Sequence, residues 1–446
     1  MDTIAAIGTP NGIGAISVVR LSGPEAYPIA QKLLKRKELK PRYAHLRKIY
    51  DLKGELIDIG LVLYFKAPHS FTGEDLVEFQ CHGGVGVTRA ILEELLKGGA
   101  RLARPGEFTK RAFLNQKIDL TQAEAIGRLI ESRSIEGAKL LSRHLAGELK
   151  EFLERVRGEL LELMAYAEVS IDYAEEDLPK DLEEQLVQKA EKVAEELEEL
   201  LEQSLRRQGA ISGYKVAIVG KPNVGKSSIL NRLLNRERAI VSEIAGTTRD
   251  TIEEDLLIGT HLVRIVDTAG IREAKDQIER IGVERSRKAI EEADLVVPVI
   301  SAEGLTSEDW EILELVKKGG KEGILVVNKI DLNPTFTPPP ELEKVGCPIL
   351  KLSAKESIRS LVQKLEELLD KREGDQSLVL VSTRQIEAVR RGAEAVRKGI
   401  PLLKKGELEL FSYQIQEGIR NISEITRPFQ FDEMLEKLFS NFCVGK

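Results

Sequence analysis

The chain has 446 residues, which at about 100–200 residues per domain suggests two to four domains. Apolar residues make up 42% and charged residues 31%, so a fibrous or disordered chain is excluded. Only 3 cysteines exclude a disulfide scaffold, and no CxxC pair is present to hold zinc. The net charge of −7 argues against a broad nucleic-acid-binding surface. No apolar run approaches the about 18–20 residues of a membrane span, and the start lacks the basic region of a secretory signal. We therefore expect a cytoplasmic protein with no membrane association.

Residues 1–120 mix short apolar runs with glycine-rich turns. The runs 13–20 and 61–65 predict strands, and residues 90–97 predict a helix that ends at Gly98-Gly99. The segment carries 18 basic and 13 acidic side chains, a balance of +5. We expect a small α+β domain here.

Residues 121–212 have a different texture. Leucine, isoleucine and alanine recur with helical spacing over 121–170, and a long amphipathic helix is predicted over 181–207. Its many glutamates give the segment a balance of −10, which is typical of a solvated helix face. These residues form the first part of a helical domain.

Residues 213–374 alternate short β-branched runs with helical stretches, which indicates a parallel or mixed sheet with crossover helices. Strands are predicted at 216–219, 262–266, 295–297 and 324–327, although Pro298 weakens the third, and 333–340 is a loop. Residues 375–446 are again helical. The simplest architecture is therefore a multidomain chain of α/β and all-α parts, in which an α/β domain at 213–374 is inserted into a helical domain made of 121–212 and 375–446.

A phosphate-binding loop opens the inserted domain. Residues 220–227 fit the pattern GxxxxGK[ST] between a predicted strand and a predicted helix, the context that this motif requires. Backbone N–H groups and the helix N-terminus suit phosphate oxygens. Lys226 is expected to reach the β- and γ-phosphates, and Ser227 to ligate Mg²⁺.

Further elements select guanine and complete the magnesium site. Asp331 in Asn328-Lys329-Ile330-Asp331 can accept from both N1–H and N2–H₂ of guanine, and Ser353-Ala354-Lys355 can present an N–H to O6. Thr248 is the best candidate for a second Mg²⁺ ligand. The segment Asp267-Thr268-Ala269-Gly270 suits a water-mediated Mg²⁺ contact and a γ-phosphate contact. The order of these elements resembles that of the translation-factor-like G proteins.

The residue that positions the attacking water is not obvious. Many G proteins use a glutamine just after DxxG, but here the residue is Ile271, which cannot polarise water. Glu279 is a candidate, although composition alone favours a solvated charge. Asn223 either faces the phosphates, where a monovalent cation would neutralise developing charge, or caps the loop.

Several motifs have no general chemical meaning: residues 71–75 (FTGED), 104–109 (RPGEFT), 111–115 (RAFLN), 246–250 (GTTRD) and the tail 441–446 (NFCVGK). Around a G domain between helical segments, they resemble the MnmE family, also called TrmE, of tRNA modification GTPases. The family belongs to the TrmE-Era-EngA-like K⁺-activated G proteins. The resemblance covers essentially the whole chain and implies an N-terminal tetrahydrofolate-binding-like domain that dimerises, a central helical domain and an inserted G domain.

The resemblance also implies site residues. Contacts to GTP are implied at Asn223, Val224, Gly225, Lys226, Ser227, Ser228, Ser242, Glu243, Ile244, Ala245, Gly246, Thr247, Thr248, Asp267, Thr268, Ala269, Gly270, Asn328, Lys329, Asp331, Ser353, Ala354 and Lys355. It implies K⁺ at Asn223, Ser242, Ile244 and Thr247, hydrolysis through Glu279 with Arg249 and Asp250, and a 5-formyl- or 5,10-methylene-tetrahydrofolate at Arg20, Glu78, Lys117 and Lys446. Cys443 matches the family's C-terminal cysteine, and its tail reads Cys-Val-Gly-Lys where Cys-Ile-Gly-Lys is common.

The family's partners follow from the same resemblance. It implies a homodimer through the N-terminal domain and a heterotetramer with the flavoprotein MnmG (GidA), whose FAD supplies the redox chemistry. Together the two proteins modify C5 of the wobble uridine in certain tRNAs. The alternative is an Era-like ribosome-assembly GTPase, but the chain has one GxxxxGKS and no GxxG loop after the G domain.

Overall fold

A computed structural model describes residues 2–10, 12–172, 180–237, 254–266, 279–373, 378–427 and the single residues 439, 442 and 445. The chain divides into two compact units, which are described separately. The first contains residues 1–127, 144–193 and 394–446, and the second contains 128–143 and 194–393. Among the described residues, no helix is both long and apolar enough to span a bilayer.

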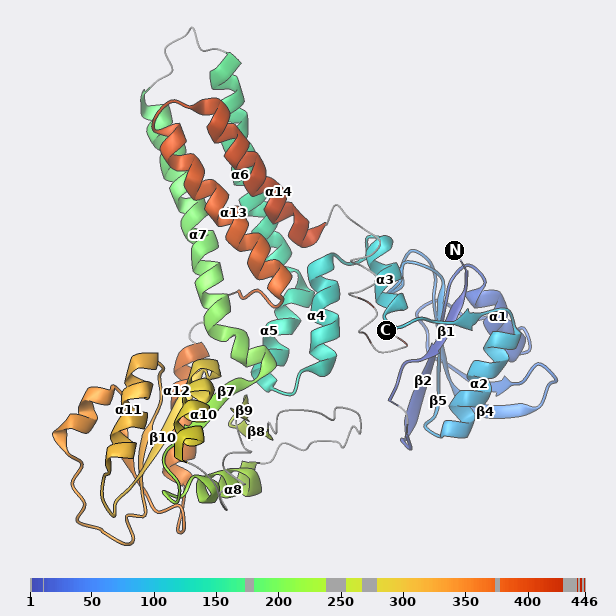
Figure 1. Ribbon diagram of the computed structural model, residues 1–446. Coiled ribbons are helices and arrows are strands. Elements are labelled where there is room, and N and C mark those ends of the chain that lie inside the picture. Colours follow the sequence, from blue (N-terminus) through green and yellow to red (C-terminus); the bar gives the residue numbers. More distant parts are fainter. Residues whose placement is uncertain are drawn as a thin grey trace. The chain divides into compact units, whose positions relative to one another are not determined.

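A six-stranded sheet forms the N-terminal part of the first unit, with the order β3-β4-β5-β2-β1-β6. Its strands are β1 Ile4–Ile7, β2 Ile16–Ser22, β3 His45–Tyr50, β4 Leu56–Phe65, β5 Leu76–His82 and β6 Arg101–Leu102. Helices α1 (Ala26–Leu33) and α2 (Val85–Lys97) cover one face (Figure 1). The expected strand 61–65 and helix 90–97 are confirmed within longer elements, whereas β2 begins later than expected, at Ile16.

The two faces of this sheet differ sharply. Val19, Val62 and Phe79 are fully buried against α1 and α2. On the opposite face, Leu46 pairs with Leu61, and their side chains are 66% and 39% exposed. This face therefore carries an exposed apolar pair at its β3–β4 end, beside the polar side chains of Gln80, Glu78 and Arg20, and no helix of the described chain covers the pair.

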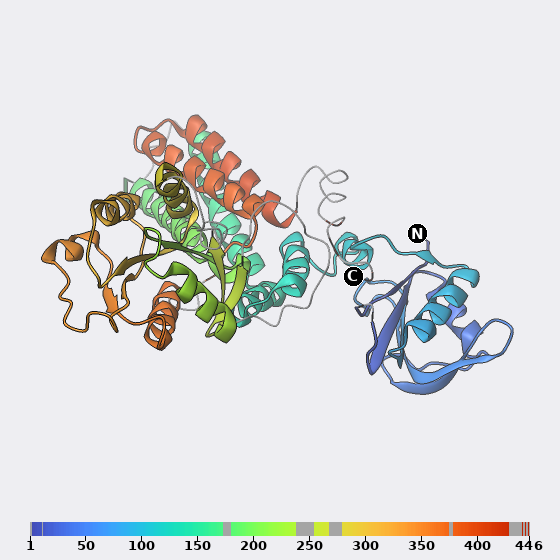
Figure 2. The ribbon, with the colours of Figure 1, turned by 60° about the horizontal axis from the view of Figure 1, so that its bottom comes forward.

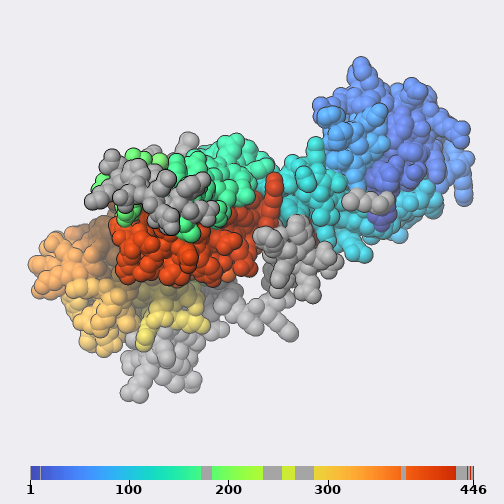
Figure 3. Space-filling model, turned by 90° about the horizontal axis from the view of Figure 1, so that it is seen from above, coloured from blue at the N-terminus to red at the C-terminus, as the bar shows by residue number. Residues whose placement is uncertain are grey.

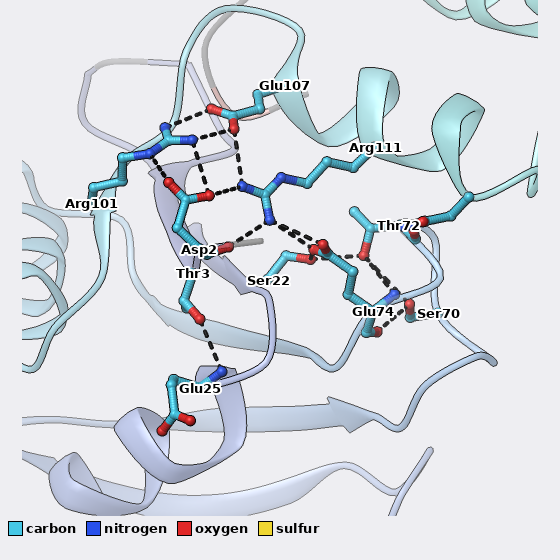
Figure 4. Close-up of polar contacts among 11 residues, drawn as sticks. Asp2, Thr3, Ser22, Glu25, Ser70, Thr72, Glu74, Arg101, Glu107 and Arg111 are labelled. Carbon is cyan, nitrogen blue, oxygen red and sulfur yellow. Dashed lines mark hydrogen bonds and ion pairs between the residues drawn. The ribbon is translucent and has the colours of Figure 1, made fainter.

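Two arginines, Arg101 and Arg111, form a network of ion pairs and hydrogen bonds beside the sheet (Figure 4). Arg111, 7% exposed, donates to the Asp2 carbonyl at 2.7 Å, to both Glu74 oxygens at 3.0 and 3.1 Å, and to Glu107 Oε1 at 3.0 Å. Arg101 contacts Glu107 at 2.6 and 2.8 Å, and it also pairs with Asp2. Burial opposes ionisation of Glu107, but the hydrogen bonds from Arg101, Arg104 N–H and Arg111 lower its pKa to about 2. A buried guanidinium without these carboxylates would be costly, so the network fixes the N-terminus and two motif segments together.

Helices make up the rest of the first unit, and some of them also contribute residues to the second. They are α3 Glu107–Leu114, α4 Leu120–Glu131, α5 Ile135–Ala146, α6 Glu148–Asp172, α7 Lys180–Ser212, α13 Thr383–Leu403 and α14 Leu408–Thr426. Helices α6 and α14 lie side by side, and Figure 3 shows their atoms in contact. The helical spacing over 121–170 and 181–207 is thus confirmed.

A second six-stranded sheet, with the order β12-β11-β10-β7-β9-β8, forms the inserted part. Its strands are β7 Tyr214–Val219, β8 Glu254–Ile258, β9 His261–Val266, β10 Leu295–Ser301, β11 Leu325–Asn328 and β12 Ile349–Lys351. All neighbours are parallel except β8 and β9, so the sheet is mixed. Pro298 does not end β10: it is the last residue paired with β7, and the continuous pairing with β11 begins one residue later.

Helices cover both faces of this sheet (Figure 2). The helical elements are α8 Lys226–Glu237, α10 Glu279–Glu292, α11 Ser307–Gly319, the 3₁₀ helix η1 Pro340–Val345 and α12 Arg359–Glu373. Apolar residues of α8 and α12 pack on one face, and those of α10 and α11 pack on the other. The expected α/β architecture is confirmed, and the loops at the carboxyl ends of β7, β11 and β12 meet at one edge.

The described residues of the C-terminal tail dock on the N-terminal part of the first unit. Phe439 is 2% exposed and packs with Phe113, Leu120 and Ala123, while the ring of Phe442 lies 5.3 Å from that of Phe439. Gly127 in α4 leaves room for this ring, because an added Cβ would lie 2.7 Å from Phe442 Cζ. The glycine therefore permits the tail to seat.

We predict that Gly127→Ala destabilises the chain by about 1–3 kcal/mol through overpacking against Phe442. The matched control is Gly158→Ala in α6, where an added Cβ meets nothing within 4 Å. That change should be neutral or stabilise by about 0.4–1 kcal/mol. Urea unfolding of both variants checks this, and equal effects would contradict the packing of Phe442 over α4.

Candidate functional site

The phosphate-binding loop joins β7 to α8. Asn223 (φ 62°) and Gly225 (φ 101°) both adopt left-handed conformations, which turn successive N–H groups toward the inside of the loop. Gly225 also permits a close approach, since an added Cβ would collide with the Asn328 amide nitrogen. The loop geometry thus depends on a residue from a different strand.

Asn328, at the end of β11, joins the phosphate and guanine sides of the site. Its Nδ2 donates to Val224 O at 2.8 Å, and its Oδ1 accepts from Ala354 N at 2.8 Å. The side chain is 2% exposed, so both bonds are made away from water. Hydrogen bonds of this kind are costly to lose, because each would leave a buried partner unsatisfied.

Lys226 begins α8 with its ammonium folded over the loop. It donates to Gly220 O at 2.6 Å and to Lys221 O at 2.7 Å. Ser227 and Ser228 follow in the first helical turn and are exposed. The structure therefore brings a lysine and a hydroxyl to a helix N-terminus, where an anion is favoured.

The residues predicted to contact guanine follow β11 and β12. Asp331 is exposed, and Ser353 is 6% exposed with a hydroxyl that has no hydrogen-bond partner in the described structure. Lys329 lies 2.6 Å from Glu303, and its hydrogen bond lowers the pKa of that exposed carboxyl. Lys355 presents its carbonyl to Arg232.

Two supporting residues were missed from the sequence. Arg232 of α8 donates to the carbonyls of Lys355 and Glu356, which holds the 353–355 turn against α8. Lys221 donates at 2.7 Å to Asp309, whose carboxylate also caps α11 through Thr306. The Thr-x-x-Asp capping box was visible in the sequence, but its ion pair with the loop was not.

The other residues predicted at the nucleotide site lie wholly or partly outside the described residues. Glu279 begins α10, but its side chain lies outside the described residues. Wholly outside them are Ser242, Glu243, Ile244, Ala245, Gly246, Thr247, Thr248, Arg249, Asp250, Asp267, Thr268, Ala269 and Gly270. Strand β9 ends at Val266, directly before the last four of these.

The N-terminal sheet brings together a second set of predicted residues. Arg20 and Glu78 are register partners on β2 and β5, and Arg20 Nε donates to Glu78 Oε1 at 2.9 Å. Arg20 Nη1 also donates to Gly445 O at 3.4 Å, which joins the tail to this pair. Lys117 is exposed and lies against Gly73, and no contact among the described residues joins it to the pair. Cys443 and Lys446 lie outside the described residues.

The two described cysteines are poor nucleophiles. Burial raises the pKa of the Cys81 thiol to about 11, and burial also raises the pKa of Cys347. Thiolate is the reactive form, so neither residue is suited to catalysis near neutral pH.

Comparisons with known proteins cover the whole chain. The family profile described as "GTP-binding protein TrmE N-terminus" matches residues 3–117, and "MnmE helical domain" matches residues 120–443. The tRNA modification GTPase MnmE of Aliarcobacter butzleri is 53% identical over 100% of this chain and 99% of its own length. The MnmE of Nitratiruptor sp. is 54% identical over the same shares.

Solved structures add a weaker likeness. The FeoB G domain from Methanococcus jannaschii is 25% identical and covers 36% of this chain and 98% of its own, with a TM-score of 0.27, too low to support an argument. None of these matches favours an Era-like ribosome-assembly GTPase. The two profiles and the full-length relatives show that this chain belongs to the MnmE (TrmE) family of tRNA modification GTPases.

Proposed function

We propose that the chain binds and hydrolyses GTP, and that hydrolysis controls a modification of the wobble uridine of certain tRNAs. The observation that carries the proposal is the Asn328 side chain, which joins the phosphate-binding loop to the 353–355 turn. This arrangement would unite a phosphate cradle with a guanine-selective edge, and the family relatives are named tRNA modification GTPases.

The described residues fit GTP with Mg²⁺. Lys226 would exchange the carbonyls of its own loop for β- and γ-phosphate oxygens, and the exposed Ser227 hydroxyl is a suitable hard oxygen ligand for Mg²⁺, with Thr248 as the second. Asp331 would accept from guanine N1–H and N2–H₂. Because Ala354 N–H already donates to Asn328, we assign the O6 contact to the neighbouring Lys355 N–H.

Hydrolysis is proposed to depend on K⁺ between two G domains. The donor chemistry of Asn223 fits this ion, since its exposed amide stands on a left-handed residue of the phosphate-binding loop. Ser242, Ile244 and Thr247 would complete the K⁺ site, and Arg249 and Asp250 belong to the same switch. Glu279 would orient the attacking water in place of the glutamine that Ile271 replaces.

The Arg20–Glu78 pair is the proposed folate site. An arginine and a carboxylate side by side can hold the polar pterin edge and the acidic tail of a 5-formyl- or 5,10-methylene-tetrahydrofolate, with Lys117 and Lys446 as further contacts. The bond from Arg20 to Gly445 supports placing the tail at this site. Cys443, two residues before Gly445, is proposed to act in the modification reaction.

The uncovered sheet face supports a homodimer through the N-terminal domain. Leu46, Ile59 and Leu61 are 66%, 43% and 39% exposed on strands β3 and β4, and apolar surface of this kind marks interfaces. We further propose a heterotetramer with the flavoprotein MnmG (GidA), whose FAD supplies redox chemistry, and a cytoplasmic location. We also propose that the domains span residues 1–120, 121–212, 213–374 and 375–446.

Deletion of the gene should remove the modified wobble uridine from bulk tRNA, because no GTP-driven step would then support its formation. Mass analysis of tRNA nucleosides measures this, with a wild-type copy of the gene as the control that restores the modification. Unchanged wobble uridines in the deletion strain would refute the proposed function.

GTP turnover should rise sharply when K⁺ replaces Na⁺ at equal ionic strength, since Na⁺ is too small for the proposed cage. Phosphate release assays measure the turnover, and equal rates in the two salts would rule out the cation mechanism.

Glu279→Ala should keep GTP binding and lose most hydrolysis, by about 10²-fold or more for a water-positioning group. Phosphate release assays measure the hydrolysis, and surviving hydrolysis in the variant would assign the water to another group.

A further inference from the structure

The end of α1, the connection that follows it and the start of β3 concentrate positive charge on an acidic protein. Residues 32–48, here called the basic segment, contain eight basic side chains and one acidic side chain, Glu38. Their balance of +7 equals in magnitude the net charge of −7 on the whole chain. Such a local field attracts a polyanion to one place on the surface.

Within the part of the chain that the structure describes, these charges have no carboxylate partner. Lys35, Arg36, Lys37, Lys40 and Arg42 are all exposed. None of the ion pairs among the described residues includes any of them. Lys35 instead lies over the Tyr50 ring at 3.7 Å from its centroid. Unpaired cations on an ordered surface retain their full capacity to bind phosphate.

The backbone of the basic segment is held in place. Arg36 N donates to Gln31 O at 2.8 Å, and Arg42 N donates to Tyr64 O at 2.8 Å. Leu39 is buried at 4% exposure beneath them. The charges therefore stand on a fixed frame, so less ordering entropy is lost on binding.

An aromatic side chain stands among the charges. Tyr43 is 57% exposed, and its ring meets that of His45 edge-on, with centroids 4.9 Å apart. Exposed aromatic rings between cations suit nucleic acids, whose unstacked bases lie on the ring while Lys and Arg contact phosphates. An acidic polypeptide or an anionic membrane would use the charges but offer no base to the ring.

From these features we infer that the basic segment is a contact surface for the sugar–phosphate backbone of tRNA, with Tyr43 as a stacking platform. This inference rests on the proposed function and adds to it the place on this chain where tRNA is held. The surface is a local strip, which agrees with the absence of a broad basic face in the charge balance.

The test compares two triple variants of the full chain in binding an unmodified tRNA transcript. Arg36→Gln, Lys37→Gln and Lys40→Gln remove three exposed charges from the basic segment. The control, Lys317→Gln, Lys318→Gln and Lys344→Gln, removes three exposed charges from the inserted domain. Circular dichroism and GTP hydrolysis should remain as in the wild type for the first variant, because none of its residues contacts the nucleotide site.

Fluorescence anisotropy at about 0.1 M salt should show the first variant binding at least about tenfold more weakly, with a salt-dependence slope smaller by about 2–3. The control should bind like the wild type. Tyr43→Ala should weaken binding without changing the slope, because stacking releases no counterions.

The inference would be overturned if the wild-type chain did not bind tRNA at low salt, if the first variant bound tRNA as the wild type does, or if both triple variants lost tRNA binding equally. It would also be overturned if the first variant lost binding to polyglutamate or to anionic vesicles but kept its binding to tRNA. If any of these occurs while the deletion strain still lacks the modified uridine, the proposed function stands and only the surface is wrong.

Discussion

The side-chain amide of Asn328 is the contact on which the nucleotide site depends. Three loops, which follow β7, β11 and β12, meet at the site and must hold one geometry. The Asn328 amide, 2% exposed, stands at the end of β11 and joins the other two loops through its bonds with Val224 O and Ala354 N. Gly225 lies directly against this amide, where no larger residue would fit. Arg232 of α8 also holds the 353–355 turn through the Glu356 carbonyl, and Lys221 joins the phosphate-binding loop to Asp309 of α11.

In the first unit, too, one buried side chain joins segments that are distant in the sequence, but here it is the charged guanidinium of Arg111. Arg111 pairs with three carboxylates, those of Asp2, Glu74 and Glu107, and donates to a backbone carbonyl, and in doing so ties the FTGED and RPGEFT motifs to the N-terminus (Figure 4). Phe439 and Phe442 seat the tail nearby, and Arg20 reaches Gly445. Two of the motifs that lacked a chemical meaning in the sequence, FTGED and RPGEFT, thus have a structural role, because their glutamates hold the buried Arg111.

The sequence predicted elements with strong local patterns and missed those fixed by distant contacts. The phosphate-binding loop, β7, β11 and the long helices follow from spacing alone, and β10 was predicted with doubt because a central proline usually breaks a ladder. Strand β1 and edge strand β8 were not predicted, since β1 has only four residues and β8 gains its partner only through β9. The roles of Arg232, Asp309 and Gly127 could not be predicted, because each depends on a residue 88 or more positions away in the sequence.

The most direct test of the account is the affinity of Asn328→Ala for GDP, measured with a fluorescent analogue, beside the neighbouring control Asn333→Ala. Loss of two buried hydrogen bonds, each worth about 1–3 kcal/mol when a partner is left unsatisfied, amounts to about 2–6 kcal/mol and predicts binding weaker by at least about thirtyfold. The control, whose amide bonds Ala302 O on a half-buried loop, should bind as the wild type does. An unchanged affinity in a folded Asn328→Ala chain would contradict the claim that this amide holds the site together.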